Sequence, residues 1–369
     1  MMRLSTQPSS VLRTLRQTVS VSYRFFSIVE PLQGRRKPKK HTVPATDGHP
    51  LRVWEKTATV GARLARSGPP GRRAVLLLHG RTWSSLPVWD LHVPVVAAPP
   101  EGEQGGAGAA RGGQEDGAAV VSRSFMDLLA GAGYDAYAVD LRGFGGTPTD
   151  DTGRLSPIRA ATDVTSVLKW LRDMKGFAYP KPALLGWSYG GLVAQLVAQR
   201  HAGALGDLVL YGSAYDPAAV FQRPALHAKE ESPPRIRNTA EAAVEDFTLP
   251  GSICENTSAA FAQQALAADP VKVQWTDLHE FNQLNGYHVS SPTLVIHGDM
   301  DPYAPVKAQL EIFKKLDAKG DKAWHIVPYS DHCTHVLESR QQFLHAVLAF
   351  LGRPRLQPED LDPQFAFHI

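Results

Sequence analysis

Ser188 lies in a pattern that is typical of a catalytic nucleophile. Residues 186–190 read Gly-Trp-Ser-Tyr-Gly, with a short apolar run, Ala183 to Leu185, before them and a helix-forming run, Gly191 to Gln199, after them. A serine on a sharp turn from strand to helix has an exposed hydroxyl, and the nearby glycines avoid steric clashes at the bend. The amino terminus of the helix favours the oxyanion that forms after attack. We therefore predict that Ser188 is a nucleophile in acyl chemistry.

A serine nucleophile needs a base to take its proton, and the base needs an acid to orient it. Candidates for both roles follow later apolar runs. Asp299 and Asp301 follow one run, and His332 and His335 follow the next. Both aspartates and both histidines are available for their roles, so the order Ser, Asp, His predicts a catalytic triad with two candidates for the acid and two for the base.

The elements that must position these residues alternate between strands and helices. The run from Ala74 to Leu78 is apolar at every position, so both of its faces must be covered. The alternation predicts an α/β fold with an open, doubly wound, mostly parallel sheet. We expect strands at 51–55, 74–78, 134–141, 183–185, 208–211, 293–297 and 324–327, and helices at 163–171, 191–199 and 343–351.

Two segments interrupt the alternation. Residues 97–119 consist almost wholly of Gly, Ala, Pro, Glu and Gln, which predicts a low-complexity insert that cannot order itself by burying apolar area. Residues 216–288 contain helical patches at 241–247 and 258–268 and no convincing strand, which predicts an inserted helical cap. The expected domains are a leader (1–40), the first part of the core (41–215), the cap (216–288), the second part of the core (289–356) and a tail (357–369).

The excess of positive charge is concentrated in the leader, where Glu30 is the only acid, whereas the formal net charge of the whole chain is +3. The leader is rich in Arg and Ser and poor in acid, and Leu12, Leu15 and Val19 recur at helical spacing, which predicts a mitochondrial transit peptide directed to the matrix. A disordered basic tail on a cytoplasmic protein is the alternative. Because the charge lies on this segment and not across a folded face, we expect no nucleic-acid partner.

The remaining composition excludes other classes of protein. No apolar run reaches the roughly 20 residues that span a bilayer, so we expect no integral membrane segment. Cys254 and Cys333 do not make a disulfide framework, in agreement with a reducing compartment. Cys333 adjoins the candidate base, but nothing nearby predicts a thiol nucleophile. Nothing in the sequence indicates an oligomeric state.

Together, these motifs make the chain from Leu51 to Leu351 resemble the α/β-hydrolases. The motifs are a His79-Gly80 loop, an Asp-x-Arg-Gly-x-Gly turn at 140–145, the Ser188 turn, a Gly-Asp-x-Asp-Pro loop at 298–302 and a late histidine. Each motif alone is only moderately specific for this family, but their order along the chain is specific. The glycine spacing at 140–145 matches neither common phosphate-binding pattern, so a structural turn is the better interpretation.

The resemblance implies roles for the residues of the triad, the oxyanion hole and the loops around them. It favours Asp301 as the acid and His332 as the base, with His335 as a supporting residue. It also implies an oxyanion hole formed by the backbone N–H of Tyr189, the residue after the nucleophile, and that of Arg81 or, alternatively, Thr82. His79 itself is expected to shape its loop.

The expected activity is hydrolysis of an ester, thioester, lactone or amide of a small acyl substrate through an acyl-enzyme on Ser188, without a metal or organic cofactor. Acyl transfer or carbon–carbon bond hydrolysis by the same triad is the alternative reaction. A non-catalytic binding protein of the same fold is the alternative outside enzymes.

Overall fold

The computed structural model describes residues 36–58, 74–94, 120–176, 179–223, 233–317 and 321–354. The insert at 97–119 and the tail at 357–369 lie outside the described residues, as does the leader up to residue 35. The described residues all belong to one compact unit. No helix among them is long and apolar enough to cross a bilayer.

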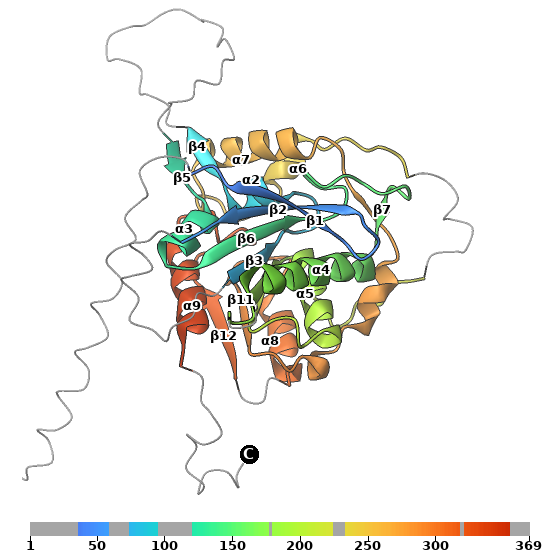
Figure 1. The fold of residues 1–369 in the computed structure, drawn as a ribbon. Coiled ribbons are helices and arrows are strands. Elements are labelled where there is room, and N and C mark those ends of the chain that lie inside the picture. The colour runs from blue at the N-terminus through green and yellow to red at the C-terminus, as the bar shows by residue number, and fades with distance from the viewer. Residues whose placement is uncertain are drawn as a thin grey trace, which may run out of the picture. The chain divides into compact units, whose positions relative to one another are not determined.

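An eight-stranded sheet forms the centre of the fold (Figure 1). The first two strands in the sheet order pair antiparallel, as do the second and third, and every later neighbour pairs parallel. This confirms the predicted doubly wound, mostly parallel sheet. The order is β1 (Lys39–Pro44), β2 (Pro50–Lys56), β6 (Asp135–Asp140), β3 (Ala74–Leu78), β8 (Ala183–Trp187), β9 (Leu208–Tyr211), β11 (Thr293–Gly298) and β12 (Lys322–Val327).

Alternate side chains of the central strands enter two separate apolar layers, because successive residues of a strand point to opposite faces. In β3, Leu76 and Leu78 belong to one layer, whereas Val75 and Leu77 belong to the other. The first layer packs against α4 (Pro157–Lys175), α5 (Tyr189–Arg200) and α8 (Val306–Lys315). The second packs against α2 (Ser85–Trp89), α3 (Phe125–Gly131) and α9 (Arg340–Gly352).

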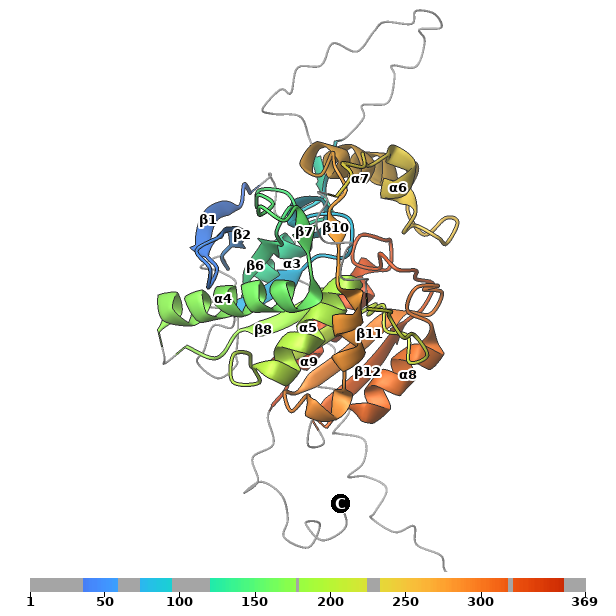
Figure 2. The ribbon, with the colours of Figure 1, turned by 90° about the vertical axis from the view of Figure 1, so that its right-hand side faces the viewer.

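The segment between β9 and β11 is the one predicted to be a cap. It contains α6 (Ala240–Val244), α7 (Glu255–Ala268) and the 3-10 helices η4 (Leu278–Gln283) and η5 (Gly286–His288). In Figure 2, α6 and α7 lie together beyond one end of the sheet. The segment also contains a short strand that we did not expect, β10 (Gln274–Trp275), which pairs parallel with β7 (Arg154–Leu155).

Two differences from the sequence prediction concern strands with little apolar content. Strand β1 includes Lys39 and Lys40, the last two residues assigned to the leader. Within β1 only Val43 is buried, because this edge strand has one neighbour and a solvated face. The short strands β4 (His92–Pro94) and β5 (Val120–Ser122) pair antiparallel on either side of the insert.

A buried ammonium group lies at the end of β2. Lys56 Nζ donates to Asp90 Oδ1 at 2.5 Å and to Asp127 Oδ1 at 2.9 Å, and all three residues are buried. His92 Nε2 lies 3.2 Å from Asp90 Oδ1. The two carboxylates and the imidazole are close enough to one another to ligate a metal ion. Because Lys56 already supplies a cation between the carboxylates, we interpret the cluster as a structural ion pair network.

Replacing Lys56 with methionine is expected to lower the free energy of unfolding by about 3–5 kcal/mol, since it leaves two buried carboxylates without their cation. Urea denaturation followed by circular dichroism measures the change. Lys39→Met is the control, because the Lys39 side chain is 72% exposed and lies 3.9 Å from Glu55. Equal unfolding midpoints for the two variants would contradict a stabilising role for Lys56.

Candidate active site

Ser188 occupies the turn between β8 and α5 in a strained backbone conformation, with φ 57° and ψ −121°. A non-glycine residue rarely adopts a positive φ, and such strain is concentrated at functional sites. Glycine is required on both sides of the turn. A Cβ atom on Gly186 would lie 2.1 Å from the Gly190 carbonyl oxygen, and one on Gly190 would lie 2.4 Å from the His79 carbonyl oxygen. The close backbone packing therefore accounts for the Gly-x-Ser-x-Gly pattern.

Asp301 and His332 form a buried hydrogen-bonded pair. Asp301 follows β11 and His332 follows β12, and His332 Nδ1 lies 2.9 Å from Asp301 Oδ2 and 3.0 Å from Oδ1. Asp301 Oδ1 also accepts the N–H groups of Tyr303 and Ala304, at 2.9 and 3.0 Å. Burial acts to lower the pKa of His332, but the charge and hydrogen bond of Asp301 outweigh it and leave the pKa above its usual value.

The same edge of the sheet carries Ser188, because the carboxyl ends of β8, β9, β11 and β12 lie side by side in parallel strands. The ring of Trp187, next to Ser188, lies 5.1 Å from the His332 ring, centroid to centroid. Trp187 Nε1 also donates to the His332 carbonyl oxygen at 2.8 Å. Gly212, after β9, approaches the pair so closely that a Cβ atom would lie 3.1 Å from Asp301 Oδ2. The structure thus brings the Ser188 turn and the Asp301–His332 pair to the same edge of the sheet.

The competing candidates have other partners. Asp299 is exposed, and its Oδ1 accepts the N–H of Ser330 at 3.0 Å. His335 is buried, with Nε2 2.9 Å from the Val88 carbonyl oxygen and Nδ1 3.0 Å from the Tyr211 hydroxyl. Burial lowers the pKa of His335 to about 3, so the ring is neutral. Both nitrogens of His335 are engaged in holding its loop against the core.

Two backbone segments meet beside Ser188. Tyr189 is the first residue of α5, so its N–H has no acceptor within the helix. The loop after β3 approaches from the other side, where a Cβ atom on Gly80 would lie 3.3 Å from Ser188 Cβ. In this loop the Arg81 guanidinium lies 5.2 Å from the centroid of the Tyr189 ring. Trp275 Nε1 donates to the Arg81 carbonyl oxygen at 3.1 Å.

His79 shapes the loop that carries Arg81. Its Nε2 accepts the N–H of Leu141 at 3.1 Å, and its Nδ1 lies 3.0 Å from the Gly80 carbonyl oxygen. Burial lowers the pKa of His79 to about 4, so it is an uncharged structural residue. The loop after β3 is thereby joined to the turn after β6.

The glycine-rich turn at 140–145 is held by ion pairs. Arg142 forms a bidentate pair with Asp163 of α4, with Nε–Oδ2 and Nη2–Oδ1 distances of 2.6 and 2.9 Å. Arg142 Nη2 also donates to Asp47 Oδ1 at 2.7 Å. Gly143 and Gly145 have φ values of 83° and 49°, which favour glycine. These contacts support the interpretation of this motif as a structural turn.

Asp331, next to His332, joins the histidine loop to the segment between β9 and β11, and nothing in the sequence pattern pointed to it. Its Oδ2 accepts the N–H of Leu249 at 3.0 Å and lies 3.4 Å from the Ser252 hydroxyl. Burial raises the pKa of Asp331. The position of His332 therefore depends on that segment as well as on the sheet.

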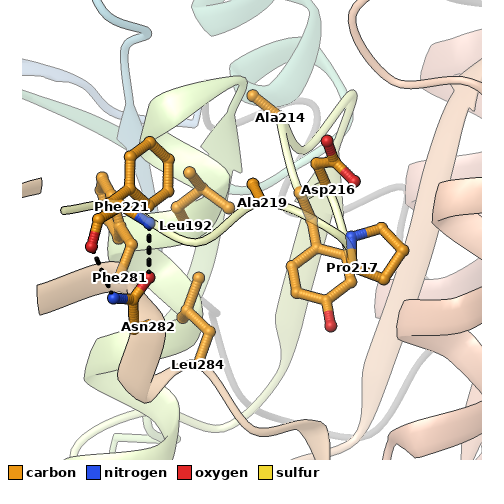
Figure 3. A pocket seen from close by; sticks show the side chains of 10 residues that line it. Leu192, Ala214, Asp216, Pro217, Ala219, Phe221, Phe281, Asn282 and Leu284 are labelled. Atoms are coloured by element: carbon orange, nitrogen blue, oxygen red, sulfur yellow. Dashed lines mark hydrogen bonds between the residues drawn. The ribbon is translucent and has the colours of Figure 1, made fainter. Parts of the chain in front are cut away.

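A pocket of about 130 Å³ lies beside α5 (Figure 3). Leu192 of α5 lines it, as does Ala214, whose N–H points to the Ser188 carbonyl oxygen at 3.4 Å. Asn282 donates to the Phe221 carbonyl oxygen at 2.9 Å and accepts the Phe221 N–H at 3.0 Å, which fixes one wall. The other lining residues are Tyr215, Asp216, Pro217, Ala219, Phe281 and Leu284.

Comparisons with known proteins agree with this architecture. Residues 113–340 match the protein family described as serine aminopeptidase, S33. The chain is also similar to the 2-hydroxy-6-oxo-6-(2'-aminophenyl)hexa-2,4-dienoic acid hydrolase of Metapseudomonas resinovorans, with 26% identity over 246 residues, which cover 63% of this chain and 78% of the relative.

Solved structures share the fold. A hydrolase from Pseudomonas aeruginosa aligns with a TM-score of 0.56 and 18% identity, over 85% of this chain and 99% of the other. A thermophilic esterase from Thermogutta terrifontis aligns with a TM-score of 0.53 and 18% identity, over 85% and 98%. The family match covers more than half of the sequence, and the chain therefore belongs to the serine aminopeptidase S33 family of α/β-hydrolases.

Proposed function

We propose that the chain is a serine hydrolase that cleaves a small-molecule ester, thioester, lactone or amide through an acyl-enzyme on Ser188. The observation that carries this proposal is the buried Asp301–His332 pair beside a strained serine at a strand-to-helix turn. In this proposal Asp301 orients His332, and His332 is the general base. The family match supports a hydrolytic activity and leaves the substrate open.

The proposed reaction has two halves. His332 Nε2 takes the proton of the Ser188 hydroxyl while Oγ bonds to the substrate carbonyl carbon, and the oxyanion accepts hydrogen bonds from the N–H groups of Tyr189 and Arg81. The protonated imidazole then gives its proton to the leaving group as the bond to that group breaks. Water, deprotonated by His332, attacks the acyl-enzyme and releases the acid and free Ser188.

Fluorophosphonate labelling tests this proposal directly, because only an activated serine reacts quickly with the probe. The expected result is stoichiometric labelling, with the modified peptide containing Ser188 identified by mass spectrometry. A folded wild-type protein that remains unlabelled would overturn the acyl-enzyme mechanism and favour a non-catalytic role for the fold.

Carbon–carbon bond hydrolysis is the second candidate, and it is favoured by the similarity to the dienoic acid hydrolase. The same triad can carry out both reactions, so the two candidates are distinguished by which substrate the protein cleaves faster. Parallel assays with p-nitrophenyl esters of increasing chain length and with a 2-hydroxy-6-oxohexa-2,4-dienoate, whose absorbance is lost on cleavage, compare the two values of kcat/KM. A higher value for the dienoate would replace ester hydrolysis as the main activity.

We further propose that the pocket beside α5 holds the part of the substrate remote from the reacting carbonyl. A cavity of about 150 Å³ accommodates a benzene ring, so a pocket of about 130 Å³ fits a short branched or small aromatic group. Ala219→Trp is expected to fill it and to raise KM about 10-fold for esters with such a group, with little change for acetate esters.

Ala218→Trp is the matched control, because Ala218 and Ala219 are both exposed but only Ala219 lines the pocket. Equal KM values for the two variants across the ester series would place the substrate elsewhere.

From the basic leader we also propose that the protein is located in mitochondria. The distribution of the full chain in fractionated cells tests this proposal.

A further inference from the structure

Asp269, the residue directly after α7, makes two hydrogen bonds to loops of the core. Its Oδ2 accepts the N–H of Ser84 at 2.8 Å, and its Oδ1 accepts the N–H of Gly145 at 2.8 Å. Ser84 lies in the loop after β3, and Gly145 lies in the turn after β6. Asp269 itself is only 4% exposed. One buried side chain from the segment between β9 and β11 thus joins two core loops.

Asp140 makes a matching pair of bonds from within the core. Its Oδ1 accepts the N–H of Ser85 and its Oδ2 accepts that of Gly146, each at 2.9 Å. The two aspartates therefore hold neighbouring N–H groups of the same two loops. The packing is tight, since a Cβ atom on Gly145 would lie 2.6 Å from Asp140 Oδ2. Asp140 belongs to β6, so Asp269 is the part of this arrangement that depends on the segment outside the sheet.

Two buried carboxylates placed side by side carry a free-energy cost. Burial raises the pKa of Asp269 to about 6 against the hydrogen bonds of Ser84 and Gly145, and the charge of Asp140 raises it further. Because folding raises the pKa of Asp269, the folded state holds the proton of this carboxyl more tightly than the unfolded state does. The resulting contribution to stability is fully present below the unfolded pKa and is lost as the pH rises through about 6. At neutral pH the ionised Asp269 therefore costs stability, which favours a role in positioning.

The loop that Asp269 holds is the one that carries Arg81, three residues before Ser84. A second hydrogen bond from the same segment reaches this loop, from Trp275 Nε1 to the Arg81 carbonyl oxygen at 3.1 Å. The aromatic ring of Trp275 also packs against Tyr189, with centroids 5.6 Å apart. Residues 269–275 therefore contact both backbone segments that flank Ser188.

We propose that Asp269 is a positioning residue that fixes the loop after β3, so that the Arg81 N–H points at the substrate oxygen. The inference rests on the proposed function, because the oxyanion role of Arg81 belongs to it. It makes the segment between β9 and β11 a part of the catalytic apparatus: without the Asp269 carboxylate, the Ser84 N–H loses its acceptor, and the loop keeps the contacts from Asp140, His79 and Trp275.

The test compares Asp269→Ala and Asp269→Asn with the wild-type chain on a p-nitrophenyl ester. We expect kcat to fall about 10- to 100-fold in the alanine variant, as a displacement of about 1 Å would cause, with KM little changed. The asparagine variant keeps one acceptor oxygen and is expected to lie between the two. Glu280→Gln is the matched control, because Glu280 also reaches from this segment to the core, where its Oε2 accepts the N–H of Ile158 at 2.7 Å.

A thionoester substrate separates positioning from general stability. Sulfur accepts hydrogen bonds weakly, so the ratio of ester to thionoester rates reports how well the donors are placed. We expect this ratio to fall in Asp269→Ala and Asp269→Asn and to stay at the wild-type value in Glu280→Gln. Wild-type kcat and ratio in a folded Asp269 variant would overturn the inference, whereas an inactive wild-type chain would instead overturn the proposed function.

Discussion

Replacing Ser188 with alanine is expected to abolish fluorophosphonate labelling and to lower kcat by about 10⁵- to 10⁶-fold, since the proposed acyl-enzyme forms on its hydroxyl. KM is expected to change little, because the hydroxyl contributes to the reaction and hardly to binding. Alanine fits the strained turn no worse than serine, and Ser188 makes no side-chain cap hydrogen bond to α5. The variant should therefore stay folded, which circular dichroism checks.

Cys333→Ala is the control for this experiment. Cys333 is the other potential nucleophile near His332, but it is fully buried, and burial raises the pKa of its thiol well above the usual value. The control is expected to retain labelling and activity. If Ser188→Ala is still labelled at the wild-type rate and Cys333→Ala is not labelled, the nucleophile is the thiol of Cys333.

Replacing Asp301 with asparagine is expected to lower kcat by about 10⁴-fold. The amide NH₂ group would donate to His332 Nδ1, which is 2.9 Å from Asp301 Oδ2 in the native pair. The ring proton would then lie on Nε2, so that this nitrogen could not accept the proton of Ser188. The loss of the carboxylate charge would also destabilise the imidazolium that forms during attack. Steady-state kinetics on a p-nitrophenyl ester measure the effect.

The pH profile of these variants gives a second measurement. In the proposed mechanism His332 acts as the base only when it is neutral. The kcat/KM of the wild-type chain should therefore rise with pH through the pKa of His332, which Asp301 raises. The residual activity of Asp301→Asn should have its acid limb at lower pH, because the raising charge is absent. Asp299→Asn is the control, since the amide oxygen can still accept the N–H of Ser330. Loss of activity in the control alone would assign the acid to Asp299.

The sequence alone was enough to locate the Ser188 turn and the sheet, because both leave a pattern in neighbouring residues of the chain. Gly186 packs against the Gly190 backbone within the turn, and Gly190 also packs against His79 at the end of β3, the neighbouring strand in the sheet. All seven expected strands are present. The signal is strongest in β3, β8 and β9, which are buried at every position because they are covered on both faces. Strand β1 lacked that signal because it is an edge strand with one buried residue.

Only the tertiary structure decided which side chains meet. His332 and His335 are three residues apart and chemically identical. The pairing of His332 with Asp301 and the contact of His335 with Val88, 247 residues away, arise from the packing of distant strands and loops. Asp269 carried no signal, because its partners lie 185 and 124 residues away in the chain. Local steric contacts and hydrophobic patterns depend on residues that are close in the sequence. The hydrogen bonds that orient the site form only once the sheet brings separate loops to one edge.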